Sequence, residues 1–154
     1  MGFLGNLMVS TCIAVPFVYG SVVVGGGVSH ATSIFVAMIF LSNTGREIIK
    51  GIVDVEGDRE RNVETVAALY GVRKAAVVSA AFHFLAVALT PIPWFLGIVS
   101  FWYLPFVTLT DMGLIMAAIL LLLNPSRENA RRIKNRELAW FLSGLLAFMI
   151  GTIG

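Results

Sequence analysis

Long apolar stretches alternate with short polar ones along this chain. Five stretches are nearly free of charge, and each approaches or reaches the ~17–25 residues with which a helix crosses a hydrocarbon layer of ~30 Å. They lie near Leu7–Gly26, Ser29–Gly45, Ala75–Thr90, Phe101–Leu123 and Leu138–Ile153. Membrane β-barrels need ten-residue segments of alternating polarity, which this sequence lacks. The pattern therefore predicts an all-α, multi-pass transmembrane bundle of about five spans.

The composition supports a membrane protein. Hydrophobic residues make up 58% of the chain and charged residues only 13%, whereas soluble domains carry about 25% charge. The net charge of +2 is too small to suggest nucleic-acid binding, and the single cysteine, Cys12, excludes an internal disulfide.

The charged residues are confined to two segments. All eleven Lys and Arg residues lie in 46–74 or 127–136, and of the acids only Asp111 lies outside these segments and their edge at Glu137. Basic connections of membrane proteins stay in the cytoplasm. Two predicted spans separate the segments, so both can face one side. We expect a cell-membrane protein with segments 46–74 and 127–137 in the cytoplasm.

Four charged residues in the first segment are spaced four apart: Arg46, Lys50, Asp54 and Asp58. On a helix they would share one face, with the two carboxylates roughly 5–6 Å apart. Two carboxylates at that distance repel each other unless a cation lies between them. Mg²⁺ suits such an open site of hard oxygen ligands, and the two basic side chains could bind phosphate. The spacing favours a magnesium–diphosphate site. The alternative is a solvated helix face on which Lys50 and Asp54 form an ordinary surface pair.

The stretch GREIIKGIVDVEGDRERNVETVAALYGVRKA, residues 45–75, resembles the second aspartate-rich region of the UbiA superfamily of intramembrane prenyltransferases. The likeness extends over the whole chain. The resemblance implies that Asp54 and Asp58 are catalytic metal ligands and that Mg²⁺ is the cofactor. The common family version has acids where this chain has Gly51 and Val53. Among subfamilies, the stretch is most similar to the archaeal enzymes that transfer geranylgeranyl to geranylgeranylglycerol phosphate.

Half of the family pattern is missing. The family has about nine spans and a first motif of the form N-x-x-x-D. Neither Asn43 nor Asn124 is followed by an acid at the fourth position in a suitable loop. We therefore expect residues 1–154 to be the C-terminal part of such a domain: a truncated gene model, a fragment or one piece of a split protein. This part alone is expected to be inactive.

The resemblance implies Mg²⁺-dependent transfer of a prenyl group from its diphosphate to a lipid-phosphate acceptor in ether-lipid synthesis. The isoprenoid tail would lie in an apolar groove between the spans, where Phe35, Phe82 and Phe84 could contribute. Two alternatives remain: a family member that prenylates an aromatic acceptor (quinone, chlorophyll or haem), and a non-enzymatic membrane carrier or assembly subunit. A carrier would be expected to show internal repeats and several polar groups at mid-membrane.

Asp111 is an ionisable residue deep within an apolar stretch. Such residues are often functional. Two interpretations are equally open, a buried hydrogen bond to a neighbouring helix and a polar contact in the active cavity. The two histidines, His30 and His83, have no second ligand nearby in the sequence, which favours simple packing or an interface position.

Overall fold

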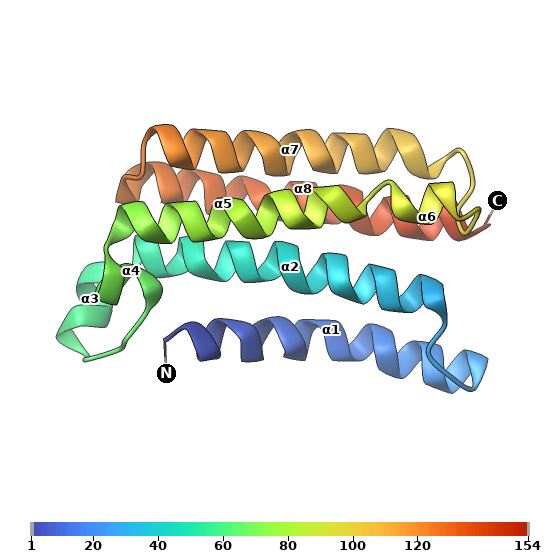
Figure 1. Ribbon diagram of the computed structural model, residues 1–154, viewed down its shortest axis with the longest axis horizontal. Coiled ribbons are helices and arrows are strands. Elements are labelled where there is room, and N and C mark those ends of the chain that lie inside the picture. The colour runs from blue at the N-terminus through green and yellow to red at the C-terminus, as the bar shows by residue number, and fades with distance from the viewer. Residues whose placement is uncertain (1, 154) are drawn as a thin grey trace.

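The computed structural model describes residues 2–153. Within them, five long helices run side by side, and three short helices lie in the connections (Figure 1). The long helices are α1 (Phe3–Gly25), α2 (His30–Val53), α5 (Val72–Leu89), α7 (Tyr103–Leu123) and α8 (Arg127–Ile153). The short ones are α3 (Val55–Glu60), α4 (Val66–Tyr70) and α6 (Ile92–Phe95). The prediction of an all-α, multi-pass bundle is confirmed.

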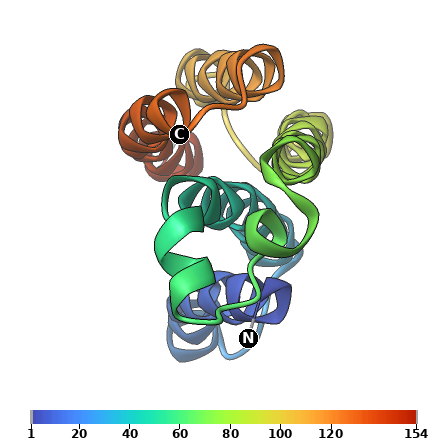
Figure 2. The same ribbon diagram turned by 90° about the vertical axis from the view of Figure 1, so that its left-hand side faces the viewer.

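Helix α2 occupies the centre of the bundle. It packs against α1, α5 and α8, while α7 packs against α5 and α8 on the side away from α1 (Figure 2). Side chains on several faces of α2 therefore meet other helices. Polar residues on α2 have neighbours from distant parts of the sequence.

Two helices extend beyond their predicted spans by two turns or more. Helix α2 continues past Gly45 to Val53, and α8 begins at Arg127 and not at Leu138. Hydropathy marks the apolar part of a helix but not its end, because a charged helical segment can continue into water. In α8, the extension carries an i,i+4 ion pair between Arg132 and Glu128.

Four segments of the described residues are long and apolar enough to cross a membrane: Phe3–Gly25, Val72–Phe95, Tyr103–Leu123 and Arg127–Ile153. Helix α2 has a comparable length of 24 residues but carries charged residues near its end. The five predicted spans thus coincide in position with the five long helices, although α2 is not among the four that are apolar enough to qualify.

Turn residues set where the helices stop. Helix α1 ends at Gly26, which adopts a left-handed φ of 69° that glycine tolerates best. Ser29 then caps α2 by accepting a hydrogen bond from the Thr32 backbone N–H.

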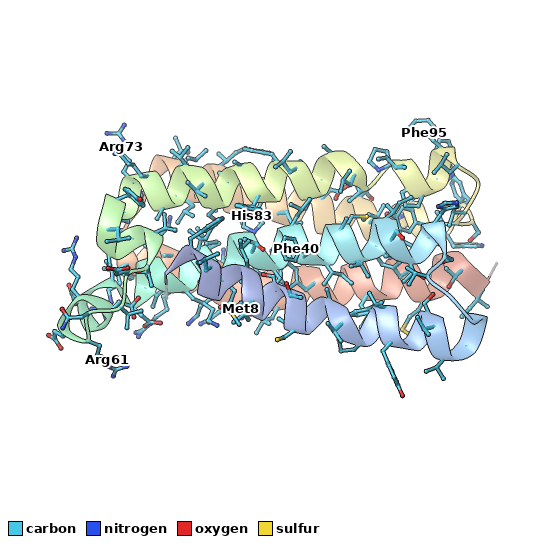
Figure 3. The ribbon with its side chains drawn as sticks, turned by 60° about the horizontal axis from the view of Figure 1, so that its bottom comes forward. Met8, Phe40, Arg61, Arg73, His83 and Phe95 are labelled. Carbon is cyan, nitrogen blue, oxygen red and sulfur yellow. The ribbon has the colours of Figure 1, made fainter. Side chains whose placement is uncertain are left out.

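The charged connections lie together at one end of the bundle. Helices α3 and α4 and the α7–α8 connection share the end at which the chain starts, and the α1–α2 connection and α6 lie at the other (Figure 1). Arg61 and Arg73 extend from the first end and Phe95 lies at the opposite one, as Figure 3 shows. The prediction that both charged segments face one side is consistent with this arrangement.

Buried aliphatic residues hold the last turns of α2 in place. Ile48, Ile49 and Ile52 are at most 1% exposed and pack into a core at the charged end. That core also contains Ala75 of α5 and Leu121 of α7. Small residues such as alanine let membrane helices approach closely. The segment that leads into the aspartates is therefore rigidly placed.

Candidate active site

The two aspartates lie at the junction between α2 and α3. Helix α2 ends at Val53, Asp54 forms the junction, and α3 begins at Val55. Helical hydrogen bonding nevertheless continues through it: the Asp54 N–H donates to the Lys50 carbonyl at 3.0 Å, and the Asp58 N–H donates to the Asp54 carbonyl at 2.9 Å. The two aspartates are thus separated by one helical turn, as the four-residue spacing predicted.

Helix α3 turns off the end of α2 towards α1 (Figures 1 and 2). Asp54 is exposed and Asp58 is half-buried. The ion pairs found around them use other acids, Glu47 and Glu56. Glu56 binds Arg127 at the start of α8 and so ties α3 to the last helix. Neither aspartate is engaged in those pairs, so their carboxylates are available for a cation.

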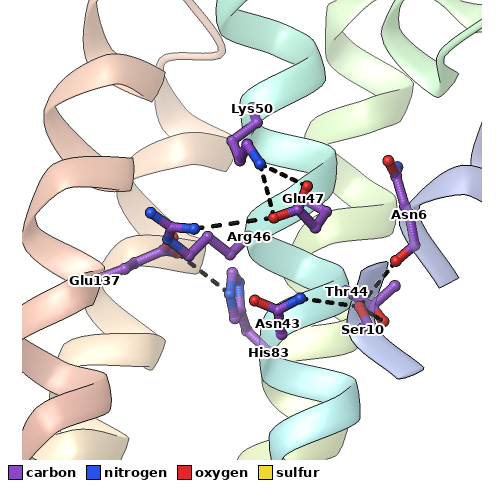
Figure 4. Close-up of polar contacts among 9 residues, drawn as sticks. All are labelled: Asn6, Ser10, Asn43, Thr44, Arg46, Glu47, Lys50, His83 and Glu137. Carbon is purple, nitrogen blue, oxygen red and sulfur yellow. Dashed lines mark hydrogen bonds and ion pairs between the residues drawn. The ribbon is translucent and has the colours of Figure 1, made fainter. Parts of the chain in front are cut away.

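The two predicted basic residues do not contact the aspartates. Lys50 Nζ lies 2.9 and 2.8 Å from the two carboxylate oxygens of Glu47 (Figure 4). Arg46 lies between two acids, with Nη1 3.9 Å from Glu47 Oε1 and Nε 4.0 Å from Glu137 Oε2. The alternative of a Lys50–Asp54 surface pair is therefore wrong, since Lys50 pairs with Glu47.

Sequence reasoning missed the acids that neutralise Arg46 and Lys50. Glu47 is largely buried, with 8% of its side chain exposed, and Glu137 of α8 is fully buried. The i,i+3 spacing of Glu47 and Lys50 was a usable signal. Glu137 gave a weaker one, because it is an acid at the edge of an apolar stretch.

His83 is not simply packed among apolar groups. Its Nε2 lies 3.3 Å from Glu137 Oε1, and both side chains are fully buried. The interpretation of His83 as a lone packing residue is therefore incomplete, because its neighbour comes from a helix far away in the sequence.

Asn43 continues this polar region towards α1. Its amide donates to the Ser10 hydroxyl at 3.1 Å, and the Thr44 hydroxyl donates to the same oxygen at 2.9 Å (Figure 4). Glu47 follows Asn43 by four residues, but both side chains lie on α2 and have these other partners. They do not form the loop motif of the family's first aspartate-rich region.

A largely apolar cavity of about 610 Å³ opens among α1, α2, α5, α7 and α8, next to this polar region. Ser42 and Asn43 line it together with the aromatic rings of Phe17, Phe35 and Phe148. Of the three phenylalanines proposed for a groove, Phe35 lines the cavity. Phe82 instead packs near Phe3, with ring centroids 6.1 Å apart, and Phe84 is 42% exposed.

Asp111 takes part in a structural contact. The Thr90 hydroxyl donates to Asp111 Oδ2 at 2.8 Å, and the Tyr103 hydroxyl donates to the Thr90 carbonyl at 2.9 Å. Thr90 lines the cavity but Asp111 does not. Of the two interpretations, the structure supports the buried hydrogen bond to a neighbouring helix.

The donor set of the two aspartates fits magnesium. No group of three or more His, Cys, Asp or Glu side chains that could hold a metal occurs within residues 2–153. Two hard carboxylates without nitrogen or sulfur ligands suit Mg²⁺, which keeps several waters and completes its shell with substrate phosphates. Asp54 and Asp58 are the residues of this chain that would hold it.

The structure gives a reason for valine at position 53, where the common family pattern has an acid. It is 1% exposed and belongs to the core of the charged end. An acid there would be buried among aliphatic side chains. Gly51 faces Thr65, because a Cβ atom at Gly51 would lie 3.5 Å from the Thr65 Cβ.

Comparison with known proteins gives a consistent result. Residues 1–151 match the model of the UbiA prenyltransferase family. A relative from Archaeoglobus fulgidus, a digeranylgeranylglyceryl phosphate synthase, is 38% identical over 98% of this chain and 53% of its own length. The Methanosarcina mazei protein of the same name is 33% identical over 96% of this chain and 50% of its own.

A solved structure is also similar. It comes from work on "the biosynthesis of Digeranylgeranylglyceryl phosphate synthase in membranes" and superposes with a TM-score of 0.90 at 32% identity. The match covers 97% of this chain and 53% of the solved one. The chain thus spans about half the length of the curated relatives and of the structure that it matches.

Proposed function

Because the chain belongs to the UbiA prenyltransferase family, we propose that it is part of an enzyme that transfers geranylgeranyl from its diphosphate to the hydroxyl of geranylgeranylglycerol phosphate. The names of its relatives support this acceptor. Since the chain spans about half of each relative, the activity is assigned to the complete protein. The first aspartate-rich motif would then come from spans outside residues 1–154 or from a separate chain.

The observation that carries the proposal is the placement of Asp54 and Asp58. They lie one helical turn apart at the charged end, at a junction held by backbone hydrogen bonds. Together they would hold Mg²⁺, which when bound supplies positive charge to the diphosphate oxygens as the allylic C–O bond breaks. The rigid core beneath α2 keeps the aspartates fixed while that charge develops.

Arg46 and Lys50 would bind the remaining phosphate oxygens. Lys50 is 41% exposed, so its ammonium group can leave Glu47 and reach a bound anion. Arg46 is 17% exposed and lies deeper. Its planar guanidinium suits two-point recognition of phosphate. The two cations would exchange contact with Glu47 for contact with the diphosphate.

The cavity would hold the isoprenoid tail. Its volume of about 610 Å³ lies within the roughly 300–1,000 Å³ typical of small-molecule sites. Ser42 and Asn43 mark its wall nearest the polar region, and the remaining lining is largely aliphatic and aromatic. An apolar lining excludes water from the carbon at which the diphosphate departs, which favours capture by the acceptor hydroxyl.

The protein is a multi-pass membrane protein. We place it in the cell membrane with its charged end in the cytoplasm, where basic connections remain. Diphosphate and Mg²⁺ are water-soluble, so this orientation brings them to the aspartates from the cytosol.

A transfer assay tests the proposal. The complete protein is incubated with Mg²⁺, labelled geranylgeranyl diphosphate and either geranylgeranylglycerol phosphate or an aromatic acceptor such as 4-hydroxybenzoate. We expect labelled digeranylgeranylglyceryl phosphate, loss of the product with EDTA, and its return with added Mg²⁺. Transfer to the aromatic acceptor alone would assign the chain to another branch of the family. No transfer to either acceptor would contradict the proposal.

A further inference from the structure

Arg46 belongs to a polar group formed by side chains from three helices. Glu47 lies beside it on α2, Glu137 reaches it from α8, and His83 of α5 lies behind Glu137 (Figure 4). The contacts run in series: Arg46 Nε to Glu137 Oε2 at 4.0 Å, then Glu137 Oε1 to His83 Nε2 at 3.3 Å. Gly45 makes room for this series, since a Cβ atom there would lie 2.8 Å from His83 Nε2.

A fully buried carboxylate is costly unless a positive group compensates it. Glu137 is 0% exposed, and the positive group nearest to it is Arg46. The arrangement therefore constrains both partners: moving the guanidinium away from Glu137 would leave the carboxylate uncompensated. His83, also 0% exposed, limits the movement of Glu137 from the other side.

Two other roles for these residues fit less well. A metal site is disfavoured, because Arg46, the third member of the series, is itself a cation beside Glu137 and would repel a metal ion. Direct contact with the isoprenoid substrate is also disfavoured, because His83 and Glu137 do not line the cavity, whereas Ala86 and Phe141, about one turn away on the same two helices, do. The pair lies behind the wall of the site and can act on it through Arg46.

We propose that Glu137, held by His83, is a positioning residue that orders the Arg46 guanidinium for binding the substrate diphosphate. This inference rests on the proposed function, in which Arg46 binds phosphate. A long side chain loses rotamer freedom when it is immobilised on a ligand, and an arginine that is already constrained loses less. Glu137 therefore strengthens diphosphate binding without touching the diphosphate.

A double-mutant cycle tests this role. The complete protein and its variants E137Q, R46Q and E137Q/R46Q are titrated with inorganic pyrophosphate in the presence of Mg²⁺. We expect E137Q to bind about three- to tenfold more weakly, the amount that ordering one flexible side chain accounts for. We expect R46Q to bind at least about tenfold more weakly, in keeping with a lost charged hydrogen-bond partner. In the R46Q background, E137Q should have no further effect, because the residue through which it acts is gone.

The matched control is E128Q, an acid of the same helix that pairs with Arg132 in solvent. It should bind pyrophosphate as the unmodified protein does. If E137Q does not fold, H83Q replaces it in the same cycle, with a weakening that likewise disappears in the R46Q background.

Three outcomes would overturn the inference. The first is that E137Q, or H83Q in its place, binds pyrophosphate as tightly as the unmodified protein or more tightly. The second is that E137Q weakens pyrophosphate binding by the same factor in the R46Q background. The third is that E128Q weakens pyrophosphate binding as much as E137Q does. If R46Q itself binds normally, the assigned role of Arg46 in the proposed function fails, which is a different result from failure of Glu137 alone.

Discussion

At the residue scale, Gly45 determines how closely α2 approaches α5. A Cβ atom at this position would lie 2.8 Å from His83 Nε2, closer than such atoms come in real structures. The carbonyl of Gly45 also accepts a hydrogen bond from the Ser79 hydroxyl at 2.9 Å. Both contacts join the same two helices, and the buried imidazole has little space in which to move. Glycine is therefore required here for packing.

We predict that Gly45→Ala destabilises the protein by about 1–3 kcal/mol, the usual cost of overpacking a tight core. The measurement is thermal unfolding in detergent, with about 2–4 °C expected for each kcal/mol. Gly20→Ala is the control, because a Cβ atom there has nothing within 4 Å. Equal melting temperatures for the two variants would show that His83 does not constrain α2.

At the element scale, the sequence predicted the number and places of the helices better than their ends. Apolar stretches marked five long helices because a segment in lipid needs apolar side chains. Its backbone N–H and C=O groups must also bond to each other, which a helix achieves. The break at Asp54 was not predicted, because the four-residue spacing of the charged residues from 46 to 58 indicated one continuous helix. Burial of Val53 and Val55 on either side of Asp54 accompanies the change of direction, and such tertiary packing cannot be read from spacing.

The candidate site was predictable only in part, because some of its geometry is set within one helix and the rest by packing between helices. The spacing of Asp54 and Asp58 depends on local geometry, and the structure keeps it. The neighbours of Arg46 depend on the packing of α8 against α2, and Glu137 is remote in sequence. Local patterns reveal contacts along one helix, whereas contacts between helices require the fold.

At the scale of the whole molecule, the bundle has one charged end and one uncharged end. Helix α3, which ends at Glu60, and the first turns of α8, which hold Arg132, lie at the charged end, and the α1–α2 connection with Gly27 lies at the other (Figure 1). All three residues are exposed. The asymmetry of Lys and Arg predicts that the charged end faces the cytoplasm.

Cysteine labelling tests this orientation. In a Cys12→Ser background, single cysteines at positions 27, 60 and 132 are treated with a membrane-impermeant maleimide. We predict labelling at position 27 in intact cells and at positions 60 and 132 only after lysis. The reverse pattern would place the aspartates on the outer side, away from cytosolic diphosphate.

The central claim is that Asp54 and Asp58 hold the divalent ion that binds the substrate diphosphate. The most direct measurement is the Mg²⁺-dependent rate of geranylgeranyl transfer by Asp54→Asn and Asp58→Asn in the complete protein, beside Glu60→Gln, an exposed acid of the same short helix. We predict that each asparagine variant inserts into the membrane and folds normally. Its transfer rate falls at least about 100-fold, because electrostatic stabilisation of the leaving group is removed. The Glu60→Gln variant stays active. Full activity in both asparagine variants would contradict the claim.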